Sequence, residues 1–419
     1  MQKTINNAYS EIMNEGLHIN PFHFIKALSL ALELSTTGIS KHHLGTAIIC
    51  KAFGETLGYD SESLQLLVCS ALLHDIGAAS DWQEKHFIIH DDEASHIFDH
   101  AENGALILSA FPLFEPMAEI VLHHHDRYLG GNPSGAVGED IPLSSRILHL
   151  ADRIDVLIDH DTNIMLQKET IVFKILSSNY FDPKLIEVFE MMSLKESFWL
   201  NTVSRDHDYL FEDSNDLFGK VTLDTDDLIS IATIFASVVD TSSRYTYKHS
   251  LNVANVAYEL ALSKQMDINE AKNYFLAGLL HDIGKLAVPN TILDKQAKLN
   301  EEELLIIKQH PYYSQLILSK VEGFEEMADW VGHHHEYDDG FGYPDRLAKN
   351  QINTGMRILQ VADIFCALVE KRPYRNSLSP ENVCNQLESM VKQEKLEAET
   401  IGLVTQEINR FMELVNKNV

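Results

Sequence analysis

The chain has 419 residues, of which 62 are acidic and 33 basic, so its formal net charge at pH 7 is −29. This charge argues against a sequence-independent grip on nucleic acid, which depends on clustered lysines and arginines, and we expect no DNA partner. The length exceeds the ~100–200 residues of a usual domain, so two domains are expected.

The four cysteines are scattered and form no CxxC pair. They are Cys50, Cys69, Cys366 and Cys384, and their spacing argues against a disulfide framework and against a thiolate zinc site. No stretch approaches the ~20 consecutive apolar residues that span a bilayer. We therefore expect a soluble, cytoplasmic protein with no membrane partner. No heptad seam is present, so the sequence leaves the oligomeric state open.

The chain contains an internal repeat. Each half contains one pair of histidines separated by 32 residues and another pair separated by 25 residues. The offset between matching positions of the two halves increases only from 207 to 211 residues along the chain. "LLHDIGAASDWQ" (72–83) matches "LLHDIGKLAVPN" (279–290), and "RILHLADRIDVL" (146–157) matches "RILQVADIFCAL" (357–368). The repeat predicts two tandem domains, a first copy over residues 1–210 and a second copy over residues 211–419.

The apolar pattern in chain order is helical. In the first copy, the turn signal "GGNPSG" (130–135) separates helical segments. In the second copy, residues 228–239, 249–262 and 271–283 carry apolar side chains at three- and four-residue spacings, and "DDGFGYP" (338–344) marks another turn. No convincing alternating strand is present. The sequence predicts an all-α protein in which each copy is a helical bundle whose polar side chains converge on one site.

Seven potential metal ligands lie in the second copy, and none is a cysteine. Imidazole and carboxylate donors suit divalent iron, manganese, nickel or zinc. Seven donors are too many for one ion, which favours two metals that share the two oxygens of Asp282. The candidate ligands are His249, His281, Asp282, His310, His334, His335 and Asp363.

His249, the pair His281-Asp282 and Asp363 resemble the ligand set of the HD superfamily of metal-dependent phosphohydrolases. "HDIGK" (281–285), "HP" (310–311), "HHHEYDDGFGYP" (333–344) and "RPYR" (372–375) are similar to its HD-GYP branch, the bacterial cyclic-dinucleotide phosphodiesterases. The resemblance covers residues 225–380. It implies two tandem HD-type helical bundles, with the catalytic domain second.

The resemblance also implies roles for single residues. The seven candidate ligands match the family's metal ligands, and Asp282 and Lys285 match catalytic positions, the lysine near the scissile phosphate. Substrate-binding positions are matched by Gly340, Gly342, Tyr343 and Pro344 of the GYP loop and by Arg372 and Arg375. Members that bind three metals carry a glutamate where this chain has Tyr245, so we expect two divalent ions, iron or manganese first, with nickel or zinc as alternatives.

The first copy keeps a full set of candidate metal ligands but lacks the residues that match substrate-binding positions in the second copy. Ala78 replaces Lys285, "LGGNPSGAVGED" replaces the GYP loop, and Asp161 stands at the position of Arg372. Buried polar groups are costly unless they are paired, so we expect a second metal site without a substrate pocket. The alternative is a degenerate domain with freely titrating histidines. The candidate ligands are His42, His74, Asp75, His100, His124, His125 and Asp152.

The resemblance implies hydrolysis of a cyclic dinucleotide substrate, c-di-GMP or 3′,3′-cGAMP, to a linear dinucleotide, and leaves open a further step to mononucleotides. One alternative is a non-catalytic cyclic-dinucleotide sensor or scaffold, which would tolerate loss of Lys285 or Asp282. The other is an HD phosphohydrolase that acts on nucleotides, against which the "GYP" and "RPYR" stretches argue.

Overall fold

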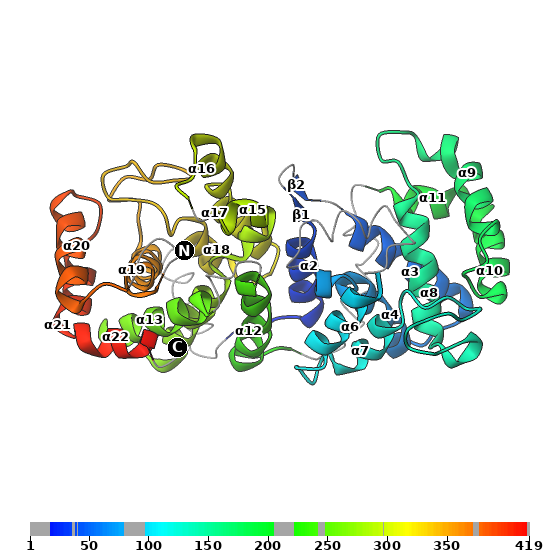
Figure 1. The fold of residues 1–419 in the computed structure, drawn as a ribbon, viewed down its shortest axis with the longest axis horizontal. Helices are drawn as coiled ribbons and strands as arrows, with labels where there is room; N and C mark the ends of the chain where they lie inside the picture. Colours follow the sequence, from blue (N-terminus) through cyan, green and yellow to red (C-terminus); the bar gives the residue numbers. More distant parts are fainter. Residues whose placement is uncertain are drawn as a thin grey trace, which may run out of the picture. The chain divides into compact units, whose positions relative to one another are not determined.

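The computed structural model describes residues 17–35, 38–39, 41–78, 97–204, 222–241, 248–295, 297–371 and 377–416. Within these ranges the chain is helical apart from one pair of two-residue strands, β1 (Leu34–Ser35) and β2 (Gly38–Ile39), and two isolated bridges. The prediction of an all-α protein is confirmed (Figure 1). No helix within the described ranges is long and apolar enough to cross a membrane.

The chain divides into two compact units. One comprises residues 20–33 and 39–221, and the other comprises residues 222–419 together with the described parts of residues 1–19 and 34–38. In the latter unit, Ile19 pairs with Leu223 through backbone hydrogen bonds of 2.8 and 3.0 Å. The predicted domain boundary at residue 210 lies outside the described residues and stays a prediction.

The repeat in the sequence is a repeat of helices. In the first copy they are α2 (Pro21–Leu32), α3 (His42–Leu57), α4 (Ser61–Leu73), η1 (Ile76–Ala78), α6 (Ile97–Leu108), α7 (Glu115–Leu122), η2 (Gly138–Asp140), α8 (Leu143–Val156), α9 (Ile164–Leu176), α10 (Pro183–Ser193) and α11 (Glu196–Thr202). In the second copy they are α12 (Thr225–Thr241), α13 (His249–Ser263), α14 (Ile268–Leu280), η4 (Ile283–Ala287), α15 (Asn290–Leu293), α16 (Glu301–Ile307), α17 (His310–Leu318), α18 (Glu325–Gly332), α19 (Thr354–Val369), α20 (Pro380–Lys392), α21 (Ala398–Gln406) and α22 (Ile408–Asn416).

Matching helices pack in the same way in the two units. Helix α3 packs against α4 and α8, as α13 packs against α14 and α19, while α6 packs against α7 as α17 does against α18. The N-cap is also repeated, because Asp60 accepts a hydrogen bond from the Ser63 amide and Asp267 accepts one from the Glu270 amide. The same local signals therefore build the same frame twice.

A glycine places the His-Asp pair against the next ligand helix. Helices α4 and α14 end at His74 and His281, and a short 3₁₀ helix follows each pair. A Cβ atom on Gly284 would lie 2.1 Å from the carbonyl oxygen of His310, and one on Gly77 would lie 2.0 Å from that of His100. Only glycine permits this approach, which brings Asp282 to His310 and Asp75 to His100.

The contact between α13 and α14 supplies a test of this packing. A Cβ atom on Gly278 would lie 2.5 Å from the Cα atom of Ala254, which is backbone and cannot rotate away. We expect Gly278→Ala to lower the free energy of unfolding by about 1–3 kcal/mol through overpacking. Gly402→Ala is the matched control, because its nearest neighbour lies 3.9 Å away, and it should be neutral or slightly stabilising. Urea unfolding of both variants measures the difference, and an equal effect would contradict the packing argument.

Candidate metal centre and active site

All seven candidate ligands of the second copy meet at one place. Six come from helix ends, where a side chain can point along the helix axis, and Asp363 comes from the middle of α19. His249 begins α13, the pair His281-Asp282 follows α14, and His310 begins α17. The remaining two, His334 and His335, follow α18.

Two carboxylates organise the cluster. Asp282 lies with Oδ2 3.1 Å from His281 Nε2 and with Oδ1 3.2 Å from His310 Nε2, so its two oxygens face different imidazoles. Asp363 Oδ1 lies 3.2 Å from His249 Nε2, and its Oδ2 lies 3.8 Å from His335 Nδ1. Each of the two carboxylates thus faces two imidazoles with its two oxygens.

Three imidazoles are oriented by backbone carbonyl oxygens that precede them in the chain. The Nδ1 atoms of His281, His310 and His334 lie 2.6–2.8 Å from the carbonyl oxygens of Gly278, Ile307 and Val331, each three residues earlier in the chain. Since a carbonyl only accepts, each Nδ1 must carry the proton and donate it. The Nε2 lone pairs are left facing the cluster, which is how metal-binding histidines are usually fixed.

Burial and neighbouring charges set the ionisation of these groups. Burial lowers the pKa of His310 to about 3 and that of His334 to about 4, so both are neutral at pH 7. Burial by itself raises the pKa of Asp282, but the charges of His281 and Lys285 outweigh it and hold the pKa well below its usual range. His310 and His334 thus offer neutral imidazoles and Asp282 an ionised carboxylate, the forms that bind metal. At His249 burial is outweighed by the carboxylates of Glu370 and Asp363, which raise its pKa to about 10.

The second-copy cluster fits a divalent cation. Asp282 Oδ1 and His281 Nε2 are buried and make no hydrogen bond among the described residues. The Nε2 atoms of His310 and His334 face each other at 3.4 Å, and with both protons on Nδ1 two lone pairs meet there. Such an arrangement is unfavourable unless a positive ion lies between the donors. The residues that would hold it are those predicted from the sequence.

The predicted substrate side lies next to this cluster. Lys285 forms an ion pair with Asp282, and the ring centroid of Tyr343 lies 4.8 Å from that of His335. Gly342 is close-packed, because a Cβ atom there would lie 2.4 Å from the Cα atom of Glu336. Gly340 has a positive φ of 73°, and Pro344 follows Tyr343 in the same loop. Arg372, Arg375 and Tyr245, which carried further predictions, lie outside the described residues.

A buried carboxylate anchors the GYP loop. Glu336 is fully buried, and its two oxygens accept hydrogen bonds of 2.6–3.0 Å from the backbone amides of residues 345, 346 and 347. The Tyr343 amide also donates to the carbonyl oxygen of His335 at 3.2 Å. The loop is therefore tied to the segment that carries two of the metal-ligand candidates.

Sequence reasoning missed several residues of the second-copy site. Glu370 accepts a hydrogen bond from His249 Nδ1 at 2.9 Å and another from Asn252 at 2.8 Å. Lys308 places its ammonium 5.2 Å from the ring centroid of Tyr343, a cation–π distance. Glu370 could have been found, because it follows Asp363 by seven residues and so returns to nearly the same side after two helical turns.

Glu370 supplies a test of how the histidines are held. Glutamine at this position would keep one accepting oxygen and place an N–H donor against either His249 or Asn252. We expect Glu370→Gln to weaken metal binding about 10- to 100-fold, the usual effect of removing a group that orients a metal ligand. Metal analysis after dialysis against a chelator series measures it, with the exposed Glu388→Gln as control. Equal metal retention by the two variants would show that Glu370 does not orient the ligand.

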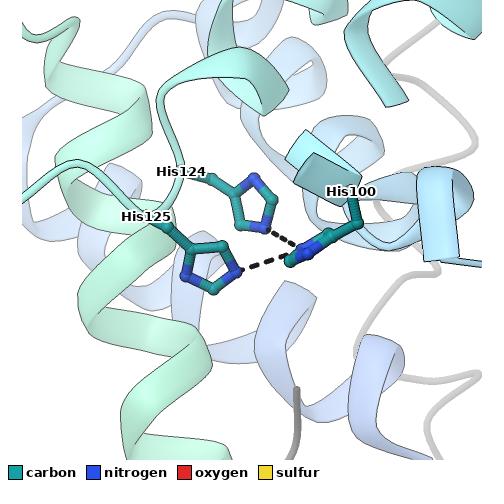
Figure 2. A group of neighbouring side chains, drawn as sticks. All are labelled: His100, His124 and His125. Carbon is teal, nitrogen blue, oxygen red and sulfur yellow. Dashed lines mark hydrogen bonds between the residues drawn. The ribbon is translucent and has the colours of Figure 1, made fainter. Parts of the chain in front are cut away.

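The first copy brings its own seven candidates together. Asp75 lies with Oδ2 3.3 Å from His74 Nε2 and with Oδ1 3.3 Å from His100 Nε2, and His42 Nε2 lies 3.1 Å from Asp152 Oδ1. Figure 2 shows the three-histidine part, in which His100 Nε2 lies 3.2 Å from His124 Nε2 and 3.1 Å from His125 Nε2. A single N–H can satisfy only one of these two contacts, and Asp75 Oδ1 makes no hydrogen bond. This cluster also fits a cation.

The substrate side is absent from the first copy. Ala78 is buried and carries no charge, and Asp161 is exposed. Asn132 occupies the loop that replaces the GYP segment, where its amide donates to the carbonyl oxygens of Arg127 and Ala136. This loop is closed by its own hydrogen bonds and places no aromatic ring on the histidine cluster as Tyr343 does in the second copy.

The profile of the HD domain matches residues 14–179 and again residues 233–399. The two matches cover most of the chain, one in each copy. The protein therefore belongs to the HD domain family.

Several relatives carry a functional name. The 3′3′-cGAMP-specific phosphodiesterase 1 of Vibrio cholerae is 29% identical over 401 residues, which cover 92% of this chain and 91% of that protein. The 3′3′-cGAMP-specific phosphodiesterase 3 of the same organism is 34% identical over 74% of this chain and 69% of its own length. A cyclic di-GMP phosphodiesterase of Pseudomonas aeruginosa is 41% identical over 32% of this chain and 33% of its own length.

A solved structure has the same fold over nearly the whole chain. The crystal structure of the cyclic GMP-AMP specific phosphodiesterase V-cGAP3 of V. cholerae superposes with a TM-score of 0.67 at 25% sequence identity. The match covers 94% of this chain and 98% of that one. The fold is thus shared over nearly the whole length of both chains.

Proposed function

We propose that this protein is a phosphodiesterase that hydrolyses a 3′–5′ bond of a cyclic dinucleotide, c-di-GMP or 3′,3′-cGAMP, to give a linear dinucleotide. The observation that carries the proposal is the ion pair of Lys285 with Asp282, because it joins a cation to a carboxylate that also faces two imidazoles. The relatives named as cyclic-dinucleotide phosphodiesterases support the same reaction.

The second copy is proposed to hold two divalent ions on its seven donors, with iron or manganese as the first candidates. When bound, such ions supply Lewis acidity toward a phosphoryl oxygen. Asp282 would serve both ions, because its two oxygens face His281 and His310. Bound cations would also offset local negative charge in a protein that has an excess of 29 negative charges and must hold a dianionic substrate.

The chain's own groups bind and orient the substrate. Lys285 donates hydrogen bonds to a phosphate oxygen beside Asp282 and neutralises charge that develops there. Tyr343 presents an aromatic face beside His335, which suits a nucleobase or ribose. The cation at Lys308 lies against the same ring and adds positive potential at this side of the cluster.

The reaction is tested by incubating the purified, metal-analysed chain with c-di-GMP, 3′,3′-cGAMP and linear pGpG, and separating the products by chromatography. Cleavage of a cyclic dinucleotide is the expected result. Tight binding without cleavage would instead indicate a sensor or scaffold. Turnover confined to linear nucleotides would indicate another HD phosphohydrolase.

The assignment of catalysis to the second copy gives a paired test. We expect Asp282→Ala to abolish turnover, because it removes the carboxylate shared by the two groups of imidazoles. Asp75→Ala, the same change at the matching position of the first copy, should leave a measurable rate. Steady-state rates of the two variants decide the matter, and the opposite pattern would move the active site to the first copy.

Lys285 should act on the chemical step more than on binding. Loss of one charge-assisted contact of ~1.5–3 kcal/mol corresponds to about a 10- to 100-fold effect. We expect Lys285→Ala to lower kcat by that factor while KM rises less, because the ammonium lies at the reacting phosphate. Lys308→Met, at a cation farther from Asp282, is the comparison variant. A normal kcat with a raised KM for Lys285→Ala would place the scissile phosphate elsewhere.

A further inference from the structure

The first copy has an eighth potential ligand, a further imidazole, that the repeat does not predict. His43 Nε2 lies 3.5 Å from Asp75 Oδ2, and its ring centroid lies 4.9 Å from that of His74. One ligand atom from each of His43, His74 and Asp75 falls within 4.8 Å of the other two. All three side chains are largely buried, and His43 is only 3% exposed.

His43 is held through its Nδ1 side and through its backbone amide. Its Nδ1 lies 3.4 Å from the hydroxyl oxygen of Ser29, which is fully buried, and its backbone amide donates to Glu33 Oε1 at 2.6 Å. With Nδ1 directed at α2, Nε2 is left facing Asp75. A ligand fixed through its other ring nitrogen is the usual design of a metal-binding histidine.

The second copy uses the matching position differently. Ser250 stands there, and both its amide and its hydroxyl donate to Asp240, at 3.1 and 2.9 Å. Its hydroxyl is therefore engaged by Asp240. The Asp282 Oδ2 atom instead pairs with Lys285, whereas in the first copy the matching atom, Asp75 Oδ2, faces His43. In the first copy, the His43 imidazole thus lies beside Asp75 where the Lys285 ammonium lies beside Asp282 in the second copy.

A second contact closes the first-copy cluster from the other side. Arg153 donates from Nε and Nη2 to Asp152 Oδ2, at 2.9 and 2.8 Å, so one oxygen of this carboxylate is occupied. The second copy has Ile364 at the matching position, and both oxygens of Asp363 face histidines there. Structural metal sites are closed by protein ligands, whereas catalytic sites keep a position open for water or substrate.

We propose that the first copy holds a closed, structural metal centre in which His43 is a ligand. His43 lies beside Asp75 as Lys285 lies beside Asp282 in the second copy. The inference goes beyond the proposed function, because it assigns metal chemistry to the copy that lacks the substrate lysine. In this centre His43 supplies a donor and Arg153 restrains Asp152, so no position is left for a phosphate. The centre stabilises the first copy without turning over substrate.

The test uses Zn²⁺ and the full chain carrying His281→Ala and Asp282→Ala, which weakens the second-copy site. This background should still bind Zn²⁺ after dialysis, and added Zn²⁺ should raise its Tm, since a metal that binds only the folded state stabilises it. Adding His43→Ser introduces the residue found at the matching position of the second copy, Ser250. It should weaken Zn²⁺ binding about 10- to 100-fold or more, since even a group that only orients a ligand has an effect of that size. His43→Gln keeps more of the side-chain volume and should have the same effect. His160→Ser, at an exposed histidine, is the control and should change nothing.

Circular dichroism checks that each variant keeps its helices. Unchanged Zn²⁺ affinity in either folded His43 variant would overturn the role of His43 as a ligand. A background chain that retains no Zn²⁺ and shows no shift in Tm would overturn the first-copy centre itself. Neither result depends on catalysis, because the wild-type chain's hydrolysis of cyclic dinucleotides is measured separately and can fail or succeed independently.

Discussion

The largely buried carboxylate of each His-Asp pair is the group on which both clusters depend. Asp75 and Asp282 lie among imidazoles, where an ionised carboxylate costs several kcal/mol unless it is paired. The helix end, the 3₁₀ turn and the glycine two residues later all serve to hold this group at the next ligand helix. Because the two oxygens face different imidazoles, one side chain links the two halves of each cluster.

The two copies show how one frame supports two kinds of site. Two imidazoles in each copy, His74 and His124 in the first and His281 and His334 in the second, direct Nδ1 at the carbonyl oxygen three residues earlier, and this leaves their Nε2 atoms directed inward. The difference lies in the partner of the shared carboxylate, a lysine in the second copy and a histidine in the first. The ligand frame can therefore persist while the groups that touch a substrate change.

The carboxylate that orients the first histidine of the cluster, His42 or His249, does not come from matching positions in the two copies. His249 Nδ1 is held by Glu370 at 2.9 Å, and His42 Nδ1 is held by Asp155 at 2.8 Å. Along the repeat, Glu370 matches Asp159 and Asp155 matches Cys366, so the orienting carboxylate has moved by one helical turn between the copies. Asp159 instead accepts hydrogen bonds within a local turn. A carboxylate on the same side of the last ligand helix serves as well from either turn.

The sequence by itself determined the all-α class, the duplication and both sets of seven candidate metal ligands. Helical periodicity and the spacing of histidines can be read directly from the order of residues. The sequence also determined which copy has the substrate lysine. Helical periodicity could place Glu370 on the side of α19 that carries Asp363. Only the tertiary structure decided that Glu370 holds His249, since these two residues are 121 positions apart. The same is true of His43. In the sequence it is one more histidine beside His42, and only the packing of α2 against its Nδ1 side turns its Nε2 toward Asp75.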